Sequence, residues 1–390
     1  MKELSRTISI RVPRTIIAMN ASSQVGALGK ELGTESALIV TDQGVVKAGL
    51  TGAVEQSLKQ ENIPFSIYDI CPVSAPISSV LDCARVIINN KHNMVIGIGG
   101  GSVIDLAKLA TLVASHEGDK SILFDTKLIK KRGVRTIFLP TTAGTGSEVS
   151  ATAVCTDEDS HRKMAVYHDL NWADVAVLDP VLTMNLPPAI TAETGMDALS
   201  HGIEAYTSVK ANTVADMFAE KTIRLVSENL RLAYAKGSQN PEARYNMMLA
   251  ASFGILSPQT SSSGYIVHSF SYPLGMMANL GHGKACALML PYVMEFNLIG
   301  NPERFARIAE LMGEPVQGLQ LREKAERSVV AVKKLIADLR LPKTLGEVGM
   351  TKKDIPAMVD YVLKYNMYQV NDNPRMLDRA DLEYILETAL

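Results

Sequence analysis

The first half of the chain alternates short apolar runs with longer segments whose apolar residues recur at helical intervals. Residues 36–42 (SALIVTD) form a β-branched apolar run that ends in polar residues, and residues 49–63 follow with helical spacing. The same alternation predicts further strands at 65–70, 93–101 and 135–142, and further helices at 76–90 and 102–115. Apolar strands separated by such helices predict a parallel sheet covered by helices on both faces.

The pattern changes around residue 187, because the pair Pro187 and Pro188 can continue neither a helix nor a central strand. Long helical patterns follow, and no convincing strand, at 215–235, 243–256, 321–339 and 352–366. A chain of 390 residues also exceeds what one core usually organises. We therefore predict an α/β domain at 1–187 and an all-helical domain at 188–390, with a ligand in the cleft between them.

Charge and composition argue against several classes of function. The formal net charge is −2, without a basic block, so we expect no nucleic-acid partner. The N-terminus has no apolar core of signal-peptide length, and no window reaches the run of about 18 apolar residues that a membrane span needs. The cysteines form no CxxC pair, so we interpret them as packing residues in a reducing, cytoplasmic compartment: Cys71, Cys83, Cys155 and Cys286.

Two turns that follow predicted strands are rich in glycine and hydroxyl side chains. Glycine lets the backbone approach a phosphate, and the start of a helix supplies free N–H groups and the positive end of its dipole. Two such turns on one sheet suit a diphosphate, although the G-x-G-x-x-G spacing is absent, and a tight turn without a ligand is the alternative for each. The first turn holds Gly99, Gly100, Gly101 and Ser102, and the second Thr141, Thr142, Gly144 and Thr145.

Asp42 ends the predicted strand at residues 36–42. A carboxylate in this place can accept hydrogen bonds from both ribose hydroxyls and repels a 2′-phosphate, which favours NAD over NADP. A turn or helix-cap aspartate explains the residue equally well.

Four residues of the predicted helical domain suggest a metal site. Asp197 and His201 are four residues apart in a helical segment and therefore share one face. His268 and His282 lie 14 residues apart in a glycine-rich stretch. Three imidazoles and one carboxylate suit Fe²⁺ or Zn²⁺ and would hold Mg²⁺ or Ca²⁺ poorly. Any one of these histidines could instead be a hydrogen-bonded core residue. The other four stand in polar contexts typical of a surface: His92, His116, His161 and His168.

Together these motifs resemble the iron-containing (group III) alcohol dehydrogenases over essentially the whole chain. The motifs that carry the resemblance, in order, are Thr41–Gly44, Gly99–Lys108, Pro140–Ser150, Lys163, Leu178–Tyr206, His268–Ala285 and Asn373–Arg375. The resemblance implies an α/β dinucleotide-binding domain with a parallel sheet and an all-helical metal-binding domain, as in dehydroquinate synthase-like folds. It implies that the metal ligands are Asp197, His201, His268 and His282. The implied NAD(H) contacts are Asp42, Gly99, Gly100, Gly101, Ser102, Asp105, Thr141, Thr142, Thr145, Val154 and Lys163.

The implied reaction is the NAD(H)-linked interconversion of small primary alcohols and aldehydes. A divalent metal, Fe²⁺ first and Zn²⁺ second, would act as Lewis acid, with Asp197 and His268 in the catalytic centre. Tyr272 stands where the family often has a histidine for the proton relay. Met276 replaces a small residue, and Ala75 replaces an asparagine that would contact the cofactor. The serine-rich approach to His268 would admit a polar or anionic tail, as in a hydroxy-acid semialdehyde or a sulfonated aldehyde.

Three alternatives accompany this reading. Two of them, a glycerol dehydrogenase and a dehydroquinate synthase, share the two-domain plan. The synthase is a lyase that would need several Lys and Arg side chains near the metal, and the stretch from His268 to His282 has none. A non-enzymatic protein that binds NAD and a metal is the third.

Relatives are commonly dimers or larger, so we expect a homo-oligomer. Residues 7–12 (TISIRV) could pair across such an interface or form a strand within the chain.

Overall fold

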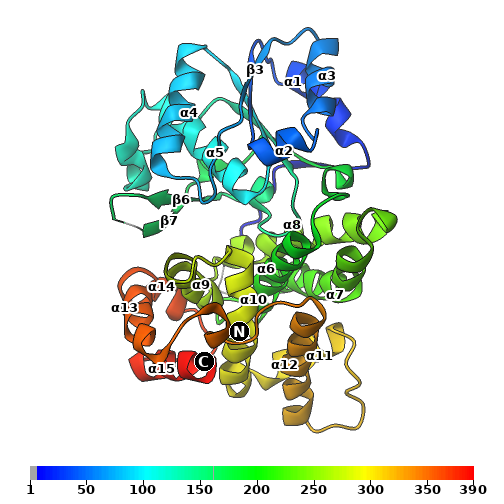
Figure 1. The fold of residues 1–390 in the computed structure, drawn as a ribbon, viewed down its shortest axis with the longest axis vertical. Helices are drawn as coiled ribbons and strands as arrows, with labels where there is room; N and C mark the ends of the chain where they lie inside the picture. The colour runs from blue at the N-terminus through cyan, green and yellow to red at the C-terminus, as the bar shows by residue number, and fades with distance from the viewer. Residues whose placement is uncertain (1–6, 161) are drawn as a thin grey trace. The chain divides into compact units, whose positions relative to one another are not determined.

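A computed structural model describes residues 7–160 and 162–390 of the chain (Figure 1). The chain divides into two compact units. An α/β unit contains residues 11–142 and 146–185, and a helical unit contains residues 186–390. Residues 7–10 and 143–145 group with the helical unit, whereas the sequence alone assigns them to the first domain.

The α/β unit is built on a six-stranded sheet with the order β1-β8-β5-β4-β2-β3, in which all neighbouring strands are parallel. The strands are β1 (Arg14–Ile17), β2 (Ala37–Val40), β3 (Phe65–Tyr68), β4 (Met94–Gly99), β5 (Arg135–Pro140) and β8 (Val175–Leu178). Every residue of β2, β4 and β8 is buried, as expected for central strands of a parallel sheet.

Helices cover both faces of this sheet, as predicted. Alternate residues of β2 point to opposite sides: Ala37 and Ile39 join one hydrophobic core, and Leu38 and Val40 join the other. The first core is completed by α1 (Val25–Glu31), α2 (Gln43–Lys47) and α3 (Gly52–Gln60), and the second by α4 (Ile77–Asn89) and α5 (Gly101–Ser115). The parallel α/β class is therefore confirmed.

The structure adds elements that the pattern did not predict. β6 (Thr152–Asp157) and β7 (Arg162–Tyr167) form an antiparallel ribbon, and β8 and β1 extend the sheet. Residues 7–12 belong to no strand, so their interpretation as an intrachain strand is wrong. Pro13 separates them from β1, and its ring nitrogen has no proton to donate to a strand ladder.

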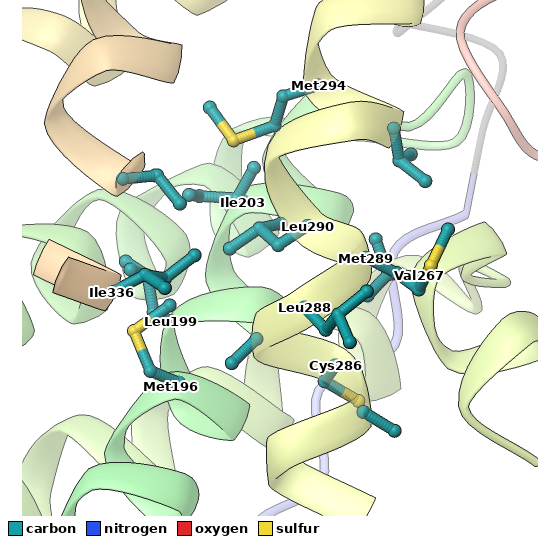
Figure 2. Close-up of a cluster of buried hydrophobic side chains, with 14 of the residues drawn as sticks. Met196, Leu199, Ile203, Val267, Cys286, Leu288, Met289, Leu290, Met294 and Ile336 are labelled. Atoms are coloured by element: carbon teal, nitrogen blue, oxygen red, sulfur yellow. The ribbon is translucent and has the colours of Figure 1, made fainter. Parts of the chain in front are cut away.

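The helical unit packs ten α-helices within residues 186–390 (Figure 1). They are α6 (Pro188–Thr207), α7 (Thr213–Lys236), α8 (Pro241–Ser261), α9 (Ile266–Met277), α10 (His282–Asn297), α11 (Pro302–Leu311), α12 (Leu321–Asp338), α13 (Ile355–Tyr365), α14 (Met367–Val370) and α15 (Arg379–Thr388). Figure 2 shows α10 at the centre of the core, where Leu290 lies near Ile203 of α6. The predicted all-helical region is confirmed.

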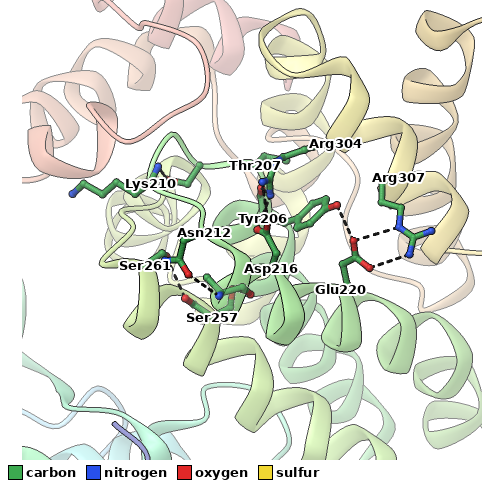
Figure 3. Close-up of polar contacts among 12 residues, drawn as sticks. Tyr206, Thr207, Lys210, Asn212, Asp216, Glu220, Ser257, Ser261, Arg304 and Arg307 are labelled. Carbon is green, nitrogen blue, oxygen red and sulfur yellow. Dashed lines mark hydrogen bonds and ion pairs between the residues drawn. The ribbon is translucent and has the colours of Figure 1, made fainter. Parts of the chain in front are cut away.

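Charged side chains fix the C-terminal end of α6 to its neighbours (Figure 3). The Tyr206 hydroxyl donates to Glu220 of α7 over 2.9 Å, and Arg307 of α11 donates to the other oxygen of Glu220 over 3.0 Å. Arg304 binds both oxygens of Asp216 at 2.6 and 2.8 Å and also donates to the Tyr206 carbonyl. The bidentate pair joins α11 to α7, and the two contacts of Tyr206 attach α6, the helix that carries Asp197 and His201, to these neighbours. Within the described residues, no helix is long and apolar enough to span a bilayer.

Candidate metal centre and dinucleotide site

α6 presents three polar side chains to the interior of the helical unit. Asp197, His201 and Glu204 are 2, 5 and 7% exposed and recur at helical spacing, so they lie on one face. Pro188 occupies the first turn of α6, where its missing N–H costs no helical hydrogen bond. Sequence spacing predicted the shared face of Asp197 and His201.

The N-terminal part of α9 and the start of α10 bring two histidines to Asp197. The Asp197 Oδ1 atom lies 3.4 Å from His268 Nε2 and 3.6 Å from His282 Nε2. The approach of α10 to α6 depends on Gly283, because a Cβ at this position would lie 2.2 Å from the Glu193 carbonyl oxygen. Three of the four predicted ligands therefore converge.

Three buried polar atoms of this cluster have no hydrogen-bond partner: Asp197 Oδ1, His201 Nδ1 and His268 Nε2. An unsatisfied buried polar group costs about 1–3 kcal/mol, and more when it is charged. A divalent cation would satisfy the carboxylate oxygen and the imidazole nitrogens together, and these donor types suit Fe²⁺ or Zn²⁺. The residues present therefore fit a metal ion.

Hydrogen bonds to the outer nitrogens orient two of the imidazoles. His268 donates from Nδ1 to Glu204 Oε2 over 2.6 Å, and Glu204 Oε1 accepts from the Val267 N–H over 2.6 Å. The Ser271 hydroxyl donates to the His268 carbonyl oxygen, so its oxygen accepts from His282 Nδ1 at 3.0 Å. In a neutral ring, both arrangements place the lone pair on Nε2, which faces Asp197, and this is how histidines bind metals in proteins. Glu204 was not predicted, although its spacing of three residues from His201 would have pointed to it.

Electrostatics favour the ligand forms of Asp197 and His201. Burial alone would raise the pKa of Asp197, but His201, His282 and His268 together lower it below its ordinary value. Burial lowers the pKa of His201 to about 3, against the opposing charge of Asp197. Burial would also lower the pKa of His268, but Cys286 and Glu204 raise it well above its ordinary value. Metal binding would therefore displace a proton from His268.

His201 lies beside the converging atoms. Its ring stacks on that of His268 with centroids 4.5 Å apart and planes 22° apart. The compact group of ligand atoms, all within 4.8 Å of one another, instead contains Asp197, His268, His282 and Cys286. The role of His201 as a ligand stays a prediction, and Cys286, which the sequence assigned to packing, lies among these ligand atoms.

Two of the residues that differ from the family pattern lie on α9. Tyr272 stacks on His282 with ring centroids 6.0 Å apart and planes 17° apart, and Met276 is 37% exposed. The predicted proton relay through Tyr272 stays a prediction.

Among the other histidines, His92 is not a surface residue: it is buried between the hydroxyls of Ser36 and Ser66, 2.8 Å from each. His116 and His168 are partly exposed, and His161 lies outside the described residues.

In the α/β unit, the predicted cofactor residues follow strands that are neighbours in the sheet. Asp42 follows β2, the turn at Gly99–Ser102 follows β4, and Thr141 and Thr142 follow β5. β3 lies on one side of β2 and β4 on the other, so the order of strands reverses between β2 and β4. The carboxyl ends of strands at such a reversal are the usual place for a nucleotide in an open parallel sheet.

In the turn after β4, Gly99 and Gly100 are glycines for different reasons. At Gly99 a Cβ would lie 2.6 Å from the Cβ of Val103, so only glycine fits the protein's own packing. At Gly100, which precedes the first turn of α5 with φ −75°, a Cβ would meet only Thr142, at an ordinary 3.5 Å. The close approach of a phosphate would explain a glycine at position 100.

Asp42 caps α2 by accepting from the Val45 N–H at Oδ1 over 3.0 Å, so the helix-cap alternative is correct for one oxygen. Oδ2 is the atom that could accept from a ribose. Ser102 accepts from the Ser74 N–H over 3.0 Å, and Ala75 follows with a left-handed φ of 44°. Asparagine, the family residue that the sequence lacks here, adopts this conformation more readily than alanine.

Asp105 and Lys108 attach β6 to α5. Asp105 accepts from the Ser147 hydroxyl and, over 3.0 Å, from the Val154 N–H. The Lys108 ammonium donates to the Thr152 carbonyl over 2.9 Å, and burial lowers the pKa of Lys108 to about 8. Asp105 and Lys108 therefore position Val154, which the sequence predicts to contact NAD(H). Lys163 lies on the partner strand β7, and Thr145 belongs to the segment that groups with the helical unit.

Glu204→Gln is expected to weaken metal binding by about 10–100-fold, because a neutral amide makes His268 a poorer ligand than a carboxylate does. The metal retained against a graded series of chelator concentrations measures the effect. The matched control is Glu220→Gln, also in the helical unit, which removes the negative charge that pairs with Arg307 but touches no proposed ligand. Equal metal retention in the two variants would refute the role of Glu204.

Comparison with known proteins places the chain in a family. Residues 13–180 match the family model for iron-containing alcohol dehydrogenase, and residues 191–390 match the model for the C-terminal region of the Fe-containing alcohol dehydrogenase family. The chain is 36% identical over 381 residues to 1,3-propanediol dehydrogenase of Klebsiella pneumoniae, covering 95% of each chain. It is 34% identical over 378 residues to NAD-dependent methanol dehydrogenase of Bacillus methanolicus, covering 97% of this chain and 98% of the relative. A solved structure of 1,3-propanediol oxidoreductase superposes with a TM-score of 0.94 at 35% identity, covering 99% of this chain and 100% of the other. The chain therefore belongs to the iron-containing alcohol dehydrogenase family.

Proposed function

We propose that this chain interconverts small primary alcohols and aldehydes with NAD(H), at a divalent metal held by Asp197, His268 and His282 with His201 beside them. The observation that carries the proposal is the set of buried ligand atoms without hydrogen-bond partners around Asp197 Oδ1. Membership of the family makes the chain an oxidoreductase of alcohols and aldehydes. The metal, its ligands and the cofactor contacts are the proposed part.

We propose Fe²⁺ as the first choice of metal and Zn²⁺ as the second. A carboxylate with imidazoles accepts either ion, so the supply of metal would influence which one is bound. When bound, the metal would supply Lewis acidity at the substrate oxygen, and the nicotinamide would supply or accept the hydride.

The chain's own residues have separate tasks in this proposal. Asp197 contributes the negative charge that balances part of the cation, and burial keeps water away from it. Glu204 holds the His268 ring in one orientation through the 2.6 Å hydrogen bond. Tyr272 can pass a proton through its hydroxyl without becoming ionised, since an ordinary phenol titrates at about 10.

The choice of NAD(H) rests on the residues at the carboxyl ends of β2, β4 and β5. We propose that the N-terminus of α5 and the turn at Gly99–Ser102 bind the diphosphate, and that Asp42 Oδ2 binds the ribose. The carboxylate of Asp42 would repel the 2′-phosphate of NADP. The relative from Bacillus methanolicus is named as NAD-dependent, in agreement with this choice.

The assay that tests the proposal follows NADH absorbance with protein stripped of metal and reloaded with Fe²⁺ or Zn²⁺. The substrates are short aldehydes, including some with an anionic tail, because serines precede His268 along the chain. We expect turnover only in the reloaded protein, with NADH preferred to NADPH. Equal turnover in stripped and reloaded protein would refute the metal site.

Two further expectations concern the protein as a whole. We propose a homo-oligomer, a dimer or larger, in which the exposed residues Ile8, Ile10 and Val12 pair with a second copy. Light scattering on the purified protein measures this mass directly. The four cysteines are free and buried, which suits the reducing environment of the cytoplasm.

A further inference from the structure

We propose that the Cys286 thiolate is a ligand of the metal, in addition to Asp197, His268 and His282. The proposal rests on the metal site of the proposed function and adds a sulfur donor to it. The resemblance to the family gave this cysteine no role.

Helical spacing places Cys286 at the site. His282 and Cys286 are four residues apart on α10 and therefore share one face. The Cys286 Sγ atom lies 4.0 Å from His282 Nε2, and it belongs to the group of four ligand atoms that all lie within 4.8 Å of one another. Bonds of about 2.0–2.3 Å in a tetrahedral site place neighbouring ligand atoms roughly 3.3–3.7 Å apart, so small side-chain shifts complete the set.

A second observation distinguishes this cysteine from one that only fills space. Asp197 Oδ1 and His268 Nε2 are buried atoms without a partner, and both belong to the same group of four as the sulfur. Cys286 is 0% exposed, with the apolar core of α10 continuing at Leu288 and Leu290 (Figure 2). The sulfur thus lies where the apolar core meets the polar cluster.

A thiolate would change the character of the site. The thiol proton leaves to the buffer on coordination, and the two negative charges of Asp197 and Cys286 then balance a dication. Sulfur is a softer donor than nitrogen or oxygen and favours Zn²⁺ and Co²⁺ over Mg²⁺ or Mn²⁺. The sulfur can bind together with His201 or in its place.

Cobalt(II) tests the proposal through its spectrum, without any assay of turnover. The full-length protein is stripped of metal, titrated with Co²⁺ under anaerobic conditions and followed by absorption. We expect visible d–d bands that saturate at one Co²⁺ per chain, accompanied by a near-ultraviolet band from thiolate-to-cobalt charge transfer. Cys286→Ser is expected to lose the charge-transfer band, to keep the d–d bands and to bind Zn²⁺ roughly 10–100-fold more weakly or worse.

The matched control is Cys83→Ser, because Cys83 is also 0% exposed on a helix but belongs to the α/β unit. It should keep both bands. Saturable d–d bands without charge transfer in the unmodified protein would overturn the role of Cys286 and leave the metal site intact. Absence of saturable d–d bands would overturn the metal site of the proposed function itself. The spectrum of the unmodified protein decides between these outcomes even if a variant fails to fold.

Discussion

His268→Ala is expected to remove bound metal and turnover together. The substitution deletes an imidazole nitrogen 3.4 Å from Asp197 Oδ1 and leaves that carboxylate buried. A metal ion contributes several kcal/mol to stabilising charge in a transition state, which corresponds to a loss of about a thousandfold or more in kcat/KM. Metal content by mass spectrometry and NADH oxidation, measured on the same sample, check the two losses.

The control for this variant must account for stability. His268→Ala also leaves Glu204 without its imidazole partner, which would destabilise the helical unit. His92→Ala removes another buried histidine, one bonded to Ser36 and Ser66 in the α/β unit. We expect both variants to melt at lower temperature, but only His268→Ala to lose metal. Full turnover in metal-free His268→Ala would exclude the proposed mechanism.

The sequence predicted the central part of the fold because burial leaves a strong periodic signal. β2, β4 and β5 are apolar runs, and α4 and α5 repeat their buried residues at helical spacing. β1 is exposed at both ends, which weakens its apolar signal, whereas β8 is as short and as buried as β2 and was overlooked. Burial alternates along β6 and β7, but their sequences do not: Ala153–Cys155 and Met164–Val166 are consecutive apolar residues, which hides the alternation that identifies a strand.

The candidate metal centre divides into local and long-range parts. Helical spacing alone placed Asp197 and His201 on one face, but the contact of Asp197 with His268 and His282 depends on how α9 and α10 pack on α6. That packing requires glycine at position 283, because a Cβ there would collide with the carbonyl oxygen of Glu193, and this contact is visible only in the folded structure. Periodicity cannot supply this information, and the resemblance to a family did.

Two residues that lie beside the predicted ligands were missed although local spacing could have found them. Glu204 is three residues from His201, and Cys286 is four residues from His282, so each shares a helical face with a predicted ligand. The prediction that His92 lies on the surface was wrong for a different reason. Its charged sequence neighbours suggested a surface, but Ser36 and Ser66 come from distant parts of the chain and satisfy both ring nitrogens.

Gly100→Ala is expected to weaken NADH binding about tenfold or more without harming the fold. The added methyl group meets only Thr142, at 3.5 Å, and the φ of −75° suits alanine. The protein's own packing therefore tolerates the substitution. A phosphate at the N-terminus of α5 would approach this backbone closely, and a lost contact worth about 1.4 kcal/mol gives a tenfold change in Kd.

Gly52→Ala provides the comparison that isolates the effect of the phosphate. Gly52 also lies at the start of a helix, α3, and a Cβ there would have no heavy atom within 4 Å. NADH affinity, measured by fluorescence titration, should fall in Gly100→Ala and stay unchanged in Gly52→Ala, while both melt near the temperature of the unmodified protein. Unchanged affinity in Gly100→Ala would mean that the turn after β4 only joins strand to helix, and the diphosphate would have to bind elsewhere. A fall in affinity that appears equally for NADH and for adenosine would instead indicate a general disturbance of the nucleotide site, because adenosine has no phosphate.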